Sequence, residues 1–238
     1  MVCMSGLGKI YEIGQVYRSE PSQTSRHAAE FTGVDCEWEG VKSEHELVDF
    51  ECEMLRHAMG EALAFLGAEF AAAYPKATVP GPEKVIAFRE AQAILGISGD
   101  ESLSAEQEQE RELGRIMAEQ GHEMVALVQV PWKQHPFYHM KEVVGGEVFT
   151  KSFELLYRGV EITTGAVREH RHVVLMGQLA EKGLTGKGME FYLDGFKLGA
   201  PPHGGFGLGL ARVVMLFLGL ASIKEATFIH RGPGRLVP

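Results

Sequence analysis

The sequence is poor in cysteine, in excess positive charge and in long apolar runs, and each shortage excludes a class of protein. Its three cysteines are an odd number without metal-ligand spacing, which argues against a disulfide framework and for reduced thiols. Lysine and arginine total 23 against 32 aspartate and glutamate, so any contact with nucleic acid must be a local patch. No apolar run approaches the roughly 18 residues of a membrane helix, and the N-terminus lacks the features of a signal peptide. We therefore expect a soluble, cytoplasmic protein without membrane contact.

The chain is long and apolar enough for one large domain, with 238 residues of which 45% are hydrophobic. Residues 9–18 and 31–39 are rich in bulky and aromatic side chains and predict two strands, which a long polar loop joins into a hairpin. The spacing Ser43-x-x-Glu46 is typical of a capping box and predicts an amphipathic helix that runs to about residue 72.

The rest of the chain predicts short helices and strands in mixed order. We expect helices over 88–95, from Ser104 to about Gln120, and over 208–218, the last opened by a glycine-rich run. We expect strands over 124–130, 151–160 and 188–198, and a strand or a helix over 173–179. Because strands and helices do not alternate strictly, the predicted fold class is α+β, a mainly antiparallel β-sheet flanked by helices, and not a Rossmann fold.

Charged and aromatic side chains gather where the predicted hairpin meets its loop. Arg18 and Glu20 share one face of the strand, and Arg26, His27 and Phe31 stand where the chain returns. An arginine offers a bidentate fork to a phosphate, and a carboxylate can accept from an adenine amino group. Taken alone, Arg18 and Glu20 would more simply form a surface ion pair. The presence of Arg26, His27 and Phe31 beside them favours a nucleotide site instead.

Three stretches of the chain carry a family resemblance. Residues 11–20, 24–27 and 30–35 resemble motif 2 of the class II aminoacyl-tRNA synthetases, and among them the archaeal and eukaryotic aspartyl enzymes. Residues 153–168 resemble the strand that holds magnesium and substrate in that family, and residues 199–220 resemble its motif 3. The matches occur in the family's order and cover most of the chain, which makes a chance likeness improbable.

The resemblance implies roles for individual residues. The implied ATP contacts are Arg18 (α-phosphate), Glu20 (adenine edge), Arg26 and His27 (outer phosphates), Phe31 (stacking on adenine), Glu161 and Arg212. The implied contacts of the amino-acid substrate are Asp35 (ammonium group), Arg168 (side-chain carboxylate), Gly165 and His203. Glu161 and Thr164 would be ligands of Mg²⁺, which prefers hard oxygen donors. Arg18 and Arg212 would be the catalytic groups.

The family's reaction is the ATP-dependent activation of aspartate to aspartyl-adenylate and the transfer of the aspartyl group to the tRNA acceptor end, and we expect this ligase activity here. Motif 1, which builds the family's dimer interface, and the N-terminal anticodon-binding OB-fold have no counterpart in the sequence. We therefore expect a catalytic domain over residues 1–238, and a homodimer if motif 1 is supplied upstream. In motif 3, Ala211 stands where the family has an acidic residue.

Two alternatives stay open. The first keeps adenylation but transfers the aspartyl group to ammonia or another amine without tRNA, which gives asparagine or a related amide. The second is a non-catalytic paralogue or a fragment, which the missing motif 1 and Ala211 favour.

Overall fold

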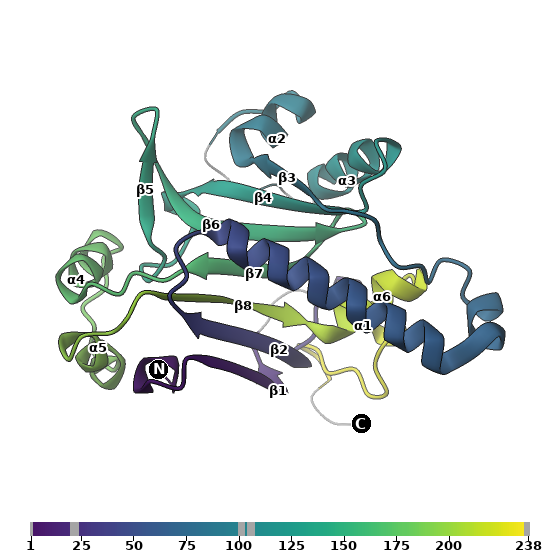
Figure 1. The fold of residues 1–238 in the computed structure, drawn as a ribbon, viewed down its shortest axis with the longest axis horizontal. Helices are drawn as coiled ribbons and strands as arrows, with labels where there is room; N and C mark the ends of the chain where they lie inside the picture. The colour runs from purple at the N-terminus through teal and green to yellow at the C-terminus, as the bar shows by residue number, and fades with distance from the viewer. Residues whose placement is uncertain (1, 20–23, 100–102, 104–107, 236–238) are drawn as a thin grey trace.

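The computed structural model describes residues 2–19, 24–99, 103 and 108–235. Within these residues eight strands form one sheet in the order β1-β2-β8-β7-β6-β4-β3, with β5 paired to β6 at the side (Figure 1). The β3–β4 pair is parallel and the other pairs are antiparallel, so the predicted fold class is confirmed. The strands are β1 Lys9–Tyr17, β2 Glu30–Glu39, β3 Lys84–Ala87, β4 Met124–Pro131, β5 Lys141–Val144, β6 Glu147–Tyr157, β7 Val160–Val167 and β8 His203–Gly209. The α-helices are α1 Glu44–Ala73, α2 Phe88–Leu95, α3 Gln109–Glu119, α4 His172–Glu181, α5 Glu190–Lys197 and α6 Leu210–Leu218.

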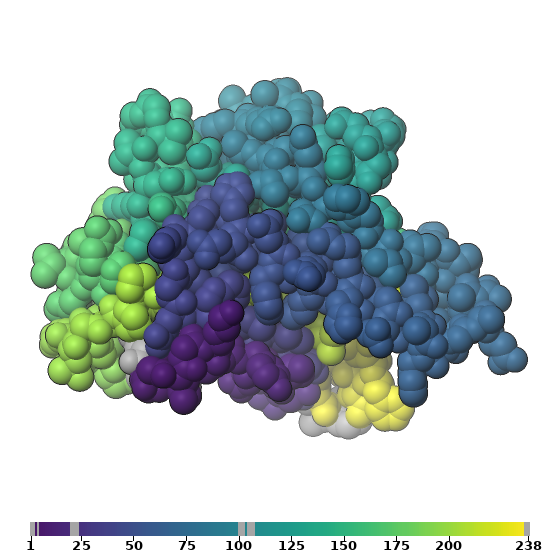
Figure 2. Space-filling model, viewed as in Figure 1, coloured from purple at the N-terminus to yellow at the C-terminus, as the bar shows by residue number. Residues whose placement is uncertain are grey.

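The sheet has two chemically different faces, because successive side chains of a strand point to opposite sides. Cys36 on β2, Phe153 and Leu155 on β6 and Phe206 on β8 are buried in the largest hydrophobic cluster, which includes residues of α1. Helix α1 crosses this face of the sheet (Figure 1), and its side chains form a continuous ridge over the middle of the molecule (Figure 2). The residues that alternate with these four point to the opposite face.

Helix α1 begins where the sequence predicts, with Ser43 as its N-cap, but the predicted capping box between Ser43 and Glu46 does not form. The side chain of Ser43 accepts a hydrogen bond from the backbone N–H of His45 at 3.2 Å. The carboxylate of Glu46 accepts from the N–H of Lys42 at 3.3 Å instead of reaching back to Ser43. Near its end the helix is interrupted at Gly67, whose φ is 75°. The predicted end near residue 72 agrees with the observed end at residue 73.

Helices α2 and α3 cover part of the opposite face, at the β3–β4 end of the sheet. Phe88 of α2 and Leu113 of α3 share a buried cluster with Val125 and Leu127 of β4. The predicted helix over 88–95 is confirmed. The proposed cap of the next helix, at Ser104, lies outside the described residues. The rest of this face is left to a cavity.

Residues 188–198 do not form the predicted strand. They contain α5, because Met189, Tyr192, Leu193 and Phe196 recur with helical spacing and pack in one cluster. The ambiguous stretch 173–179 is likewise helical, within α4.

The glycine-rich run before residue 210 is not the opening of a helix. It is strand β8, which lies in the interior of the sheet between β2 and β7. Strand β6 begins at Glu147, before the predicted 151, and the segment up to residue 160 contains a turn that leads into β7. Short strands β3 and β5 were not predicted. None of the described helices is both long and apolar enough to cross a membrane.

Candidate active site

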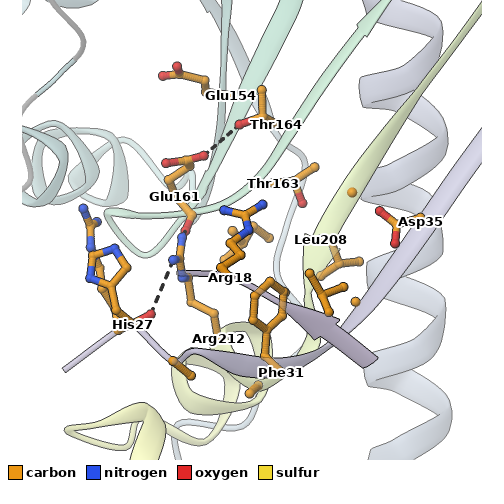
Figure 3. A pocket seen from close by; sticks show the side chains of 18 of the residues that line it. Arg18, His27, Phe31, Asp35, Glu154, Glu161, Thr163, Thr164, Leu208 and Arg212 are labelled. Atoms are coloured by element: carbon orange, nitrogen blue, oxygen red, sulfur yellow. Dashed lines mark hydrogen bonds between the residues drawn. The ribbon is translucent and has the colours of Figure 1, made fainter. Parts of the chain in front are cut away.

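A cavity of about 500 Å³ lies on the face of the sheet that carries the charged residues. Arg18 follows β1, Phe31 is on β2, Glu161 and Thr164 are on β7, and Arg212 is on the first turn of α6, and all five line it (Figure 3). The chain therefore brings residues from three distant stretches of the sequence to one place.

Glycines make the floor of the cavity. A side chain at Gly207 would place its Cβ 2.4 Å from a carboxylate oxygen of Asp35, and one at Gly33 would place it 3.1 Å from the other oxygen. Strand β8 therefore carries glycine here because a Cβ would collide with Asp35. Burial, followed by Glu12 and Glu37, raises the pKa of Asp35, and Arg18 and Arg168 partly oppose this shift.

Arg18 and Phe31 lie together at one end of the cavity. The guanidinium carbon of Arg18 is 5.5 Å from the centre of the Phe31 ring. The Arg18 backbone N–H donates to Ala29 at 2.9 Å, which fixes the point where β1 meets the returning chain. Phe31 is half-buried, and its ring offers a surface for stacking a planar base while the neighbouring guanidinium can bind a phosphate.

Arg212 connects the start of β7 to the segment before β2. It donates to the carbonyl of Glu161 at 2.5 Å and to the carbonyl of Arg26 at 3.4 Å. Burial lowers the pKa of Arg212, and Glu161 partly opposes this shift. Arg26 itself forms an ion pair with Glu110 of α3 at 2.7 Å.

Three oxygen-bearing side chains lie near each other on β6 and β7. Thr164 donates to the carboxylate of Glu161 at 2.8 Å (Figure 3), and Glu154 is the cross-strand partner of Thr164. Burial, then Glu161 and Glu110, raises the pKa of Glu154. Glu154 lies inside the stretch 153–168 but was not predicted as a site residue, because no short motif marks it.

The other end of the cavity is built around Arg168. Its guanidinium donates to one carboxylate oxygen of Glu37 at 2.7 and 3.1 Å, and to the carbonyl of Gly205 at 3.4 Å. Its Nη1 lies 3.1 Å from Nε2 of His139. Because a guanidinium has only N–H donors, this geometry requires that nitrogen of His139 to be an acceptor and the ring to be neutral. Glu37 and His139 were not predicted as site residues.

Two histidines form the wall beside Arg168. The rings of His135 and His139 lie 4.8 Å apart, and His135 Nε2 is 3.2 Å from the hydroxyl of Ser152. Burial, then Lys182 and Arg168, lowers the pKa of His135 to about 4. Burial and Arg168 lower the pKa of His139 well below its ordinary value. Both rings are therefore neutral near pH 7.

The remaining predicted site residues differ in their placement. His27 lines the cavity, with Nδ1 2.5 Å from the hydroxyl of Thr24. Gly165 lies on the opposite face, where a Cβ would come within 2.2 Å of the Phe153 ring, and it is not among the residues that line the cavity. His203 is also outside that set, buried with Nδ1 2.8 Å from the carbonyl of Pro201. Glu20 lies outside the described residues.

Known proteins match this chain over its whole length. It is 39% identical to the aspartate–tRNA(Asp) ligase of Pyrococcus abyssi over 249 residues, covering 100% of this chain and 55% of that protein. It is 38% identical to the aspartate–tRNA(Asp/Asn) ligase of Aeropyrum pernix, covering 99% of this chain and 54% of the relative. The chain thus spans about half the length of the relatives it matches.

Solved structures agree with the sequence matches. The aspartyl-tRNA synthetase of Entamoeba histolytica superimposes with a TM-score of 0.90 at 31% identity, covering 100% of this chain and 50% of that one. The asparaginyl-tRNA synthetase of the same organism, in complex with asparaginyl-adenylate, gives a TM-score of 0.87 at 28% identity, covering 99% and 55%. The family profile described as tRNA synthetases class II (D, K and N) matches residues 1–231. The chain belongs to that family, the class II tRNA synthetases of the D, K and N group.

Proposed function

We propose that this chain is the catalytic core of an aspartate–tRNA ligase, which activates aspartate with ATP and passes the aspartyl group to tRNA. The observation that carries the proposal is the convergence of Arg18, Glu161 and Arg212 on one cavity, with Arg168 at its far end. Cations and carboxylates at one end suit a magnesium-bound triphosphate, and a guanidinium at the other suits an acidic side chain.

The first step is an attack of the aspartate α-carboxylate on the α-phosphorus of ATP. A new O–P bond forms, the bond from the α-phosphorus to the bridging oxygen breaks, and its electron pair leaves with pyrophosphate. Arg18 stabilises the charge that develops on the α-phosphoryl oxygens, and Arg26, His27 and Arg212 hold the outer phosphates. Phe31 provides the face on which adenine stacks. In the second step a ribose hydroxyl oxygen of the tRNA acceptor end attacks the carbonyl carbon and forms an ester bond, the bond from that carbon to the phosphate oxygen breaks, and AMP leaves with the electron pair while the hydroxyl proton passes to the phosphate or to water.

Glu161 and Thr164 are proposed to hold Mg²⁺, with Glu154 as a further carboxylate. The donor set fits, because Thr164 donates to the carboxylate of Glu161 at 2.8 Å and Glu154 is the cross-strand partner of Thr164, which gathers hard oxygen donors in one place. Burial, then Glu161 and Glu110, raises the pKa of Glu154, and a bound cation would oppose that shift. No group of three His, Cys, Asp or Glu side chains among the described residues forms a complete metal site. Mg²⁺ usually binds through one or two carboxylates together with substrate phosphates, and Glu161 and Glu154 would supply those carboxylates. When bound, the ion neutralises charge on the phosphates.

Arg168 and Asp35 are proposed to select aspartate. Asp35 offers a carboxylate to the ammonium group, and Arg168 offers N–H donors to the side-chain carboxylate. Arg168 already contacts Glu37, His139 and Gly205. The 3.4 Å contact with Gly205 is the longest of these, and it is the one that a substrate carboxylate most readily replaces.

Two relatives support the choice of reaction. The aligned proteins from Pyrococcus abyssi and Aeropyrum pernix are named aspartate–tRNA ligases, and an aligned structure holds an aminoacyl-adenylate. A homodimer completed by a motif 1 upstream, and a cytoplasmic location, remain parts of the proposal that rest on the family alone.

ATP–pyrophosphate exchange tests the proposal. We expect exchange that depends on aspartate and Mg²⁺, that is weak with asparagine, and that is accompanied by aspartyl transfer when tRNA is added. Absence of ATP binding by calorimetry would contradict the proposal. If the chain instead forms asparagine from aspartate and ammonia without tRNA, the acceptor of the aspartyl group is ammonia and only the adenylation step of the proposal holds.

A further inference from the structure

Glu110 on α3 is a buried carboxylate that touches the candidate phosphate site, yet the proposed mechanism does not use it. Its residue is only 6% exposed. One of its oxygens lies 2.7 Å from Nη1 of Arg26 and accepts the backbone N–H of Glu161 at 3.2 Å. A single oxygen atom of Glu110 thus connects α3 to the segment before β2 and to the start of β7.

The packing of α3 explains why Glu110 reaches this far. Gly114 lies one helical turn later, on the same face of the helix. A Cβ at Gly114 would come within 2.3 Å of the Cα of Gly159, in the turn between β6 and β7. Gly159 has a φ of 73°, and a Cβ there would come within 2.9 Å of Arg111. Two glycines face each other at this contact, so α3 lies directly on the turn and Glu110 is brought to Glu161.

The contact closes a ring of hydrogen bonds among Glu110, Arg26, Arg212 and Glu161. Glu110 binds the side chain of Arg26 and the N–H of Glu161, while Arg212 binds the carbonyl of Glu161 and the carbonyl of Arg26. Each partner is therefore fixed from two sides. Within the part of the chain that the structure describes, the Arg26 guanidinium donates through one terminal nitrogen to Glu110, and a guanidinium has five N–H donors, so Arg26 can hold Glu110 and a ligand together.

We propose that Glu110 is a positioning residue that holds the guanidinium of Arg26 toward the outer phosphates of ATP. The inference rests on the proposed function, because it assigns the outer phosphates to Arg26. In this proposal the binding of the outer phosphates by Arg26 also depends on α3, a helix outside the three stretches that resemble the family. A carboxylate is needed because it pairs with the cation and also accepts from the backbone, whereas an amide would keep the shape and lose the charge.

The test compares nucleotides that do and do not carry outer phosphates. In Glu110→Gln we expect the Kd for ATP to rise on the order of tenfold, as for loss of a charge-assisted contact, while the Kd for AMP stays within about twofold. In an Arg26→Gln background, Glu110→Gln should add less than about twofold to the loss of ATP affinity, because its partner is already gone. Calorimetry measures all four proteins, and thermal melts report whether each is folded.

Glu112→Gln is the matched control, since Glu112 is on the same helix, exposed, and paired with Arg115. Equal losses of ATP and AMP affinity in Glu110→Gln would show a general structural role and overturn the inference, as would an undiminished effect without Arg26. If the wild-type chain binds ATP and Glu110→Gln behaves like Glu112→Gln, only this inference fails. If the wild-type chain binds no ATP, the proposed function fails as well.

Discussion

The two faces of the central sheet are built from the same strands, but one face packs into an apolar core and the other lines a charged cavity. Toward α1, Phe153 and Phe206 are almost fully buried in an apolar core. Toward the cavity, β8 carries glycines, and β2 and β7 carry Asp35 and Glu161. One face gains stability from apolar packing, while the other gathers charged side chains, some of them already in ion pairs such as Arg26–Glu110 and Arg168–Glu37. Substitutions on the cavity face should therefore change chemistry, and those on the α1 face should change stability.

The largest effect is expected at Arg18. Arg18→Ala removes a charge from the cavity face without opening the core, so the exchange rate should fall on the order of 10²–10³-fold. The melting temperature should stay close to that of the wild-type chain. ATP–pyrophosphate exchange at saturating aspartate measures the first quantity, and a thermal melt measures the second. A normal exchange rate would remove Arg18 from the mechanism.

Arg168→Gln should act at the opposite end of the cavity. Losing the guanidinium should raise the KM for aspartate on the order of 10–10²-fold, with a much smaller change in the KM for ATP. Kinetics with each substrate varied in turn make the comparison. An equal rise in both constants would mean that the cavity is not divided as proposed.

Gly165→Ala should lower stability, because Gly165 lies on the packed α1 face of the sheet. Because a Cβ there would meet the ring of Phe153 at 2.2 Å and the Cβ of Phe206 at 2.8 Å, we expect overpacking to cost about 1–3 kcal/mol of unfolding free energy. Denaturant titration measures the loss, with Gly177→Ala as a control, since a Cβ at Gly177 meets nothing within 4 Å. Unchanged stability in Gly165→Ala would contradict the packing described for this face.

The last comparison uses pH, at Glu51, a buried acid on the α1 face. Burial raises the pKa of Glu51 to about 8 from its ordinary 4.5, and the hydrogen bond from Thr163 opposes the shift. Because the folded pKa is raised, this group favours folding fully below about pH 4.5 and loses that contribution as the pH rises toward 8. The free energy of unfolding of Glu51→Gln should therefore rise relative to that of the wild-type chain by about 1 kcal/mol or more between pH 5 and pH 8.

Denaturant titrations at the two pH values test this, with the exposed Glu53→Gln on the same helix as control. A difference between Glu51→Gln and the wild-type chain that does not change with pH would show that Glu51 does not titrate in this range.

Much of the site could be predicted because its residues lie in long contiguous patterns. Arg18, Phe31, Glu161 and Arg212 were predicted within such stretches, and the structure brings them to one cavity. The hairpin of β1 and β2 was predicted because alternating bulky side chains mark both strands.

The errors have physical causes. Glycine is disfavoured in strands, so the sequence of residues 204–209 predicts the opening of a helix, whereas the structure shows strand β8, whose glycines are required by the close approach of Asp35 and of the neighbouring backbone. Glu110, Glu37 and His139 were missed because their partners, Arg26 and Arg168, are far away in the sequence. A single sequence carries no local signal for such pairs.

The central claim is that one cavity on the glycine-lined face binds nucleotide and aspartate together. The most direct measurement is calorimetric titration with a non-hydrolysable analogue of aspartyl-adenylate. The account predicts binding to one site that competes with both ATP and aspartate and is weakened by Arg18→Ala and by Arg168→Gln. Binding that survives both substitutions, or that leaves ATP binding unaffected, would contradict it.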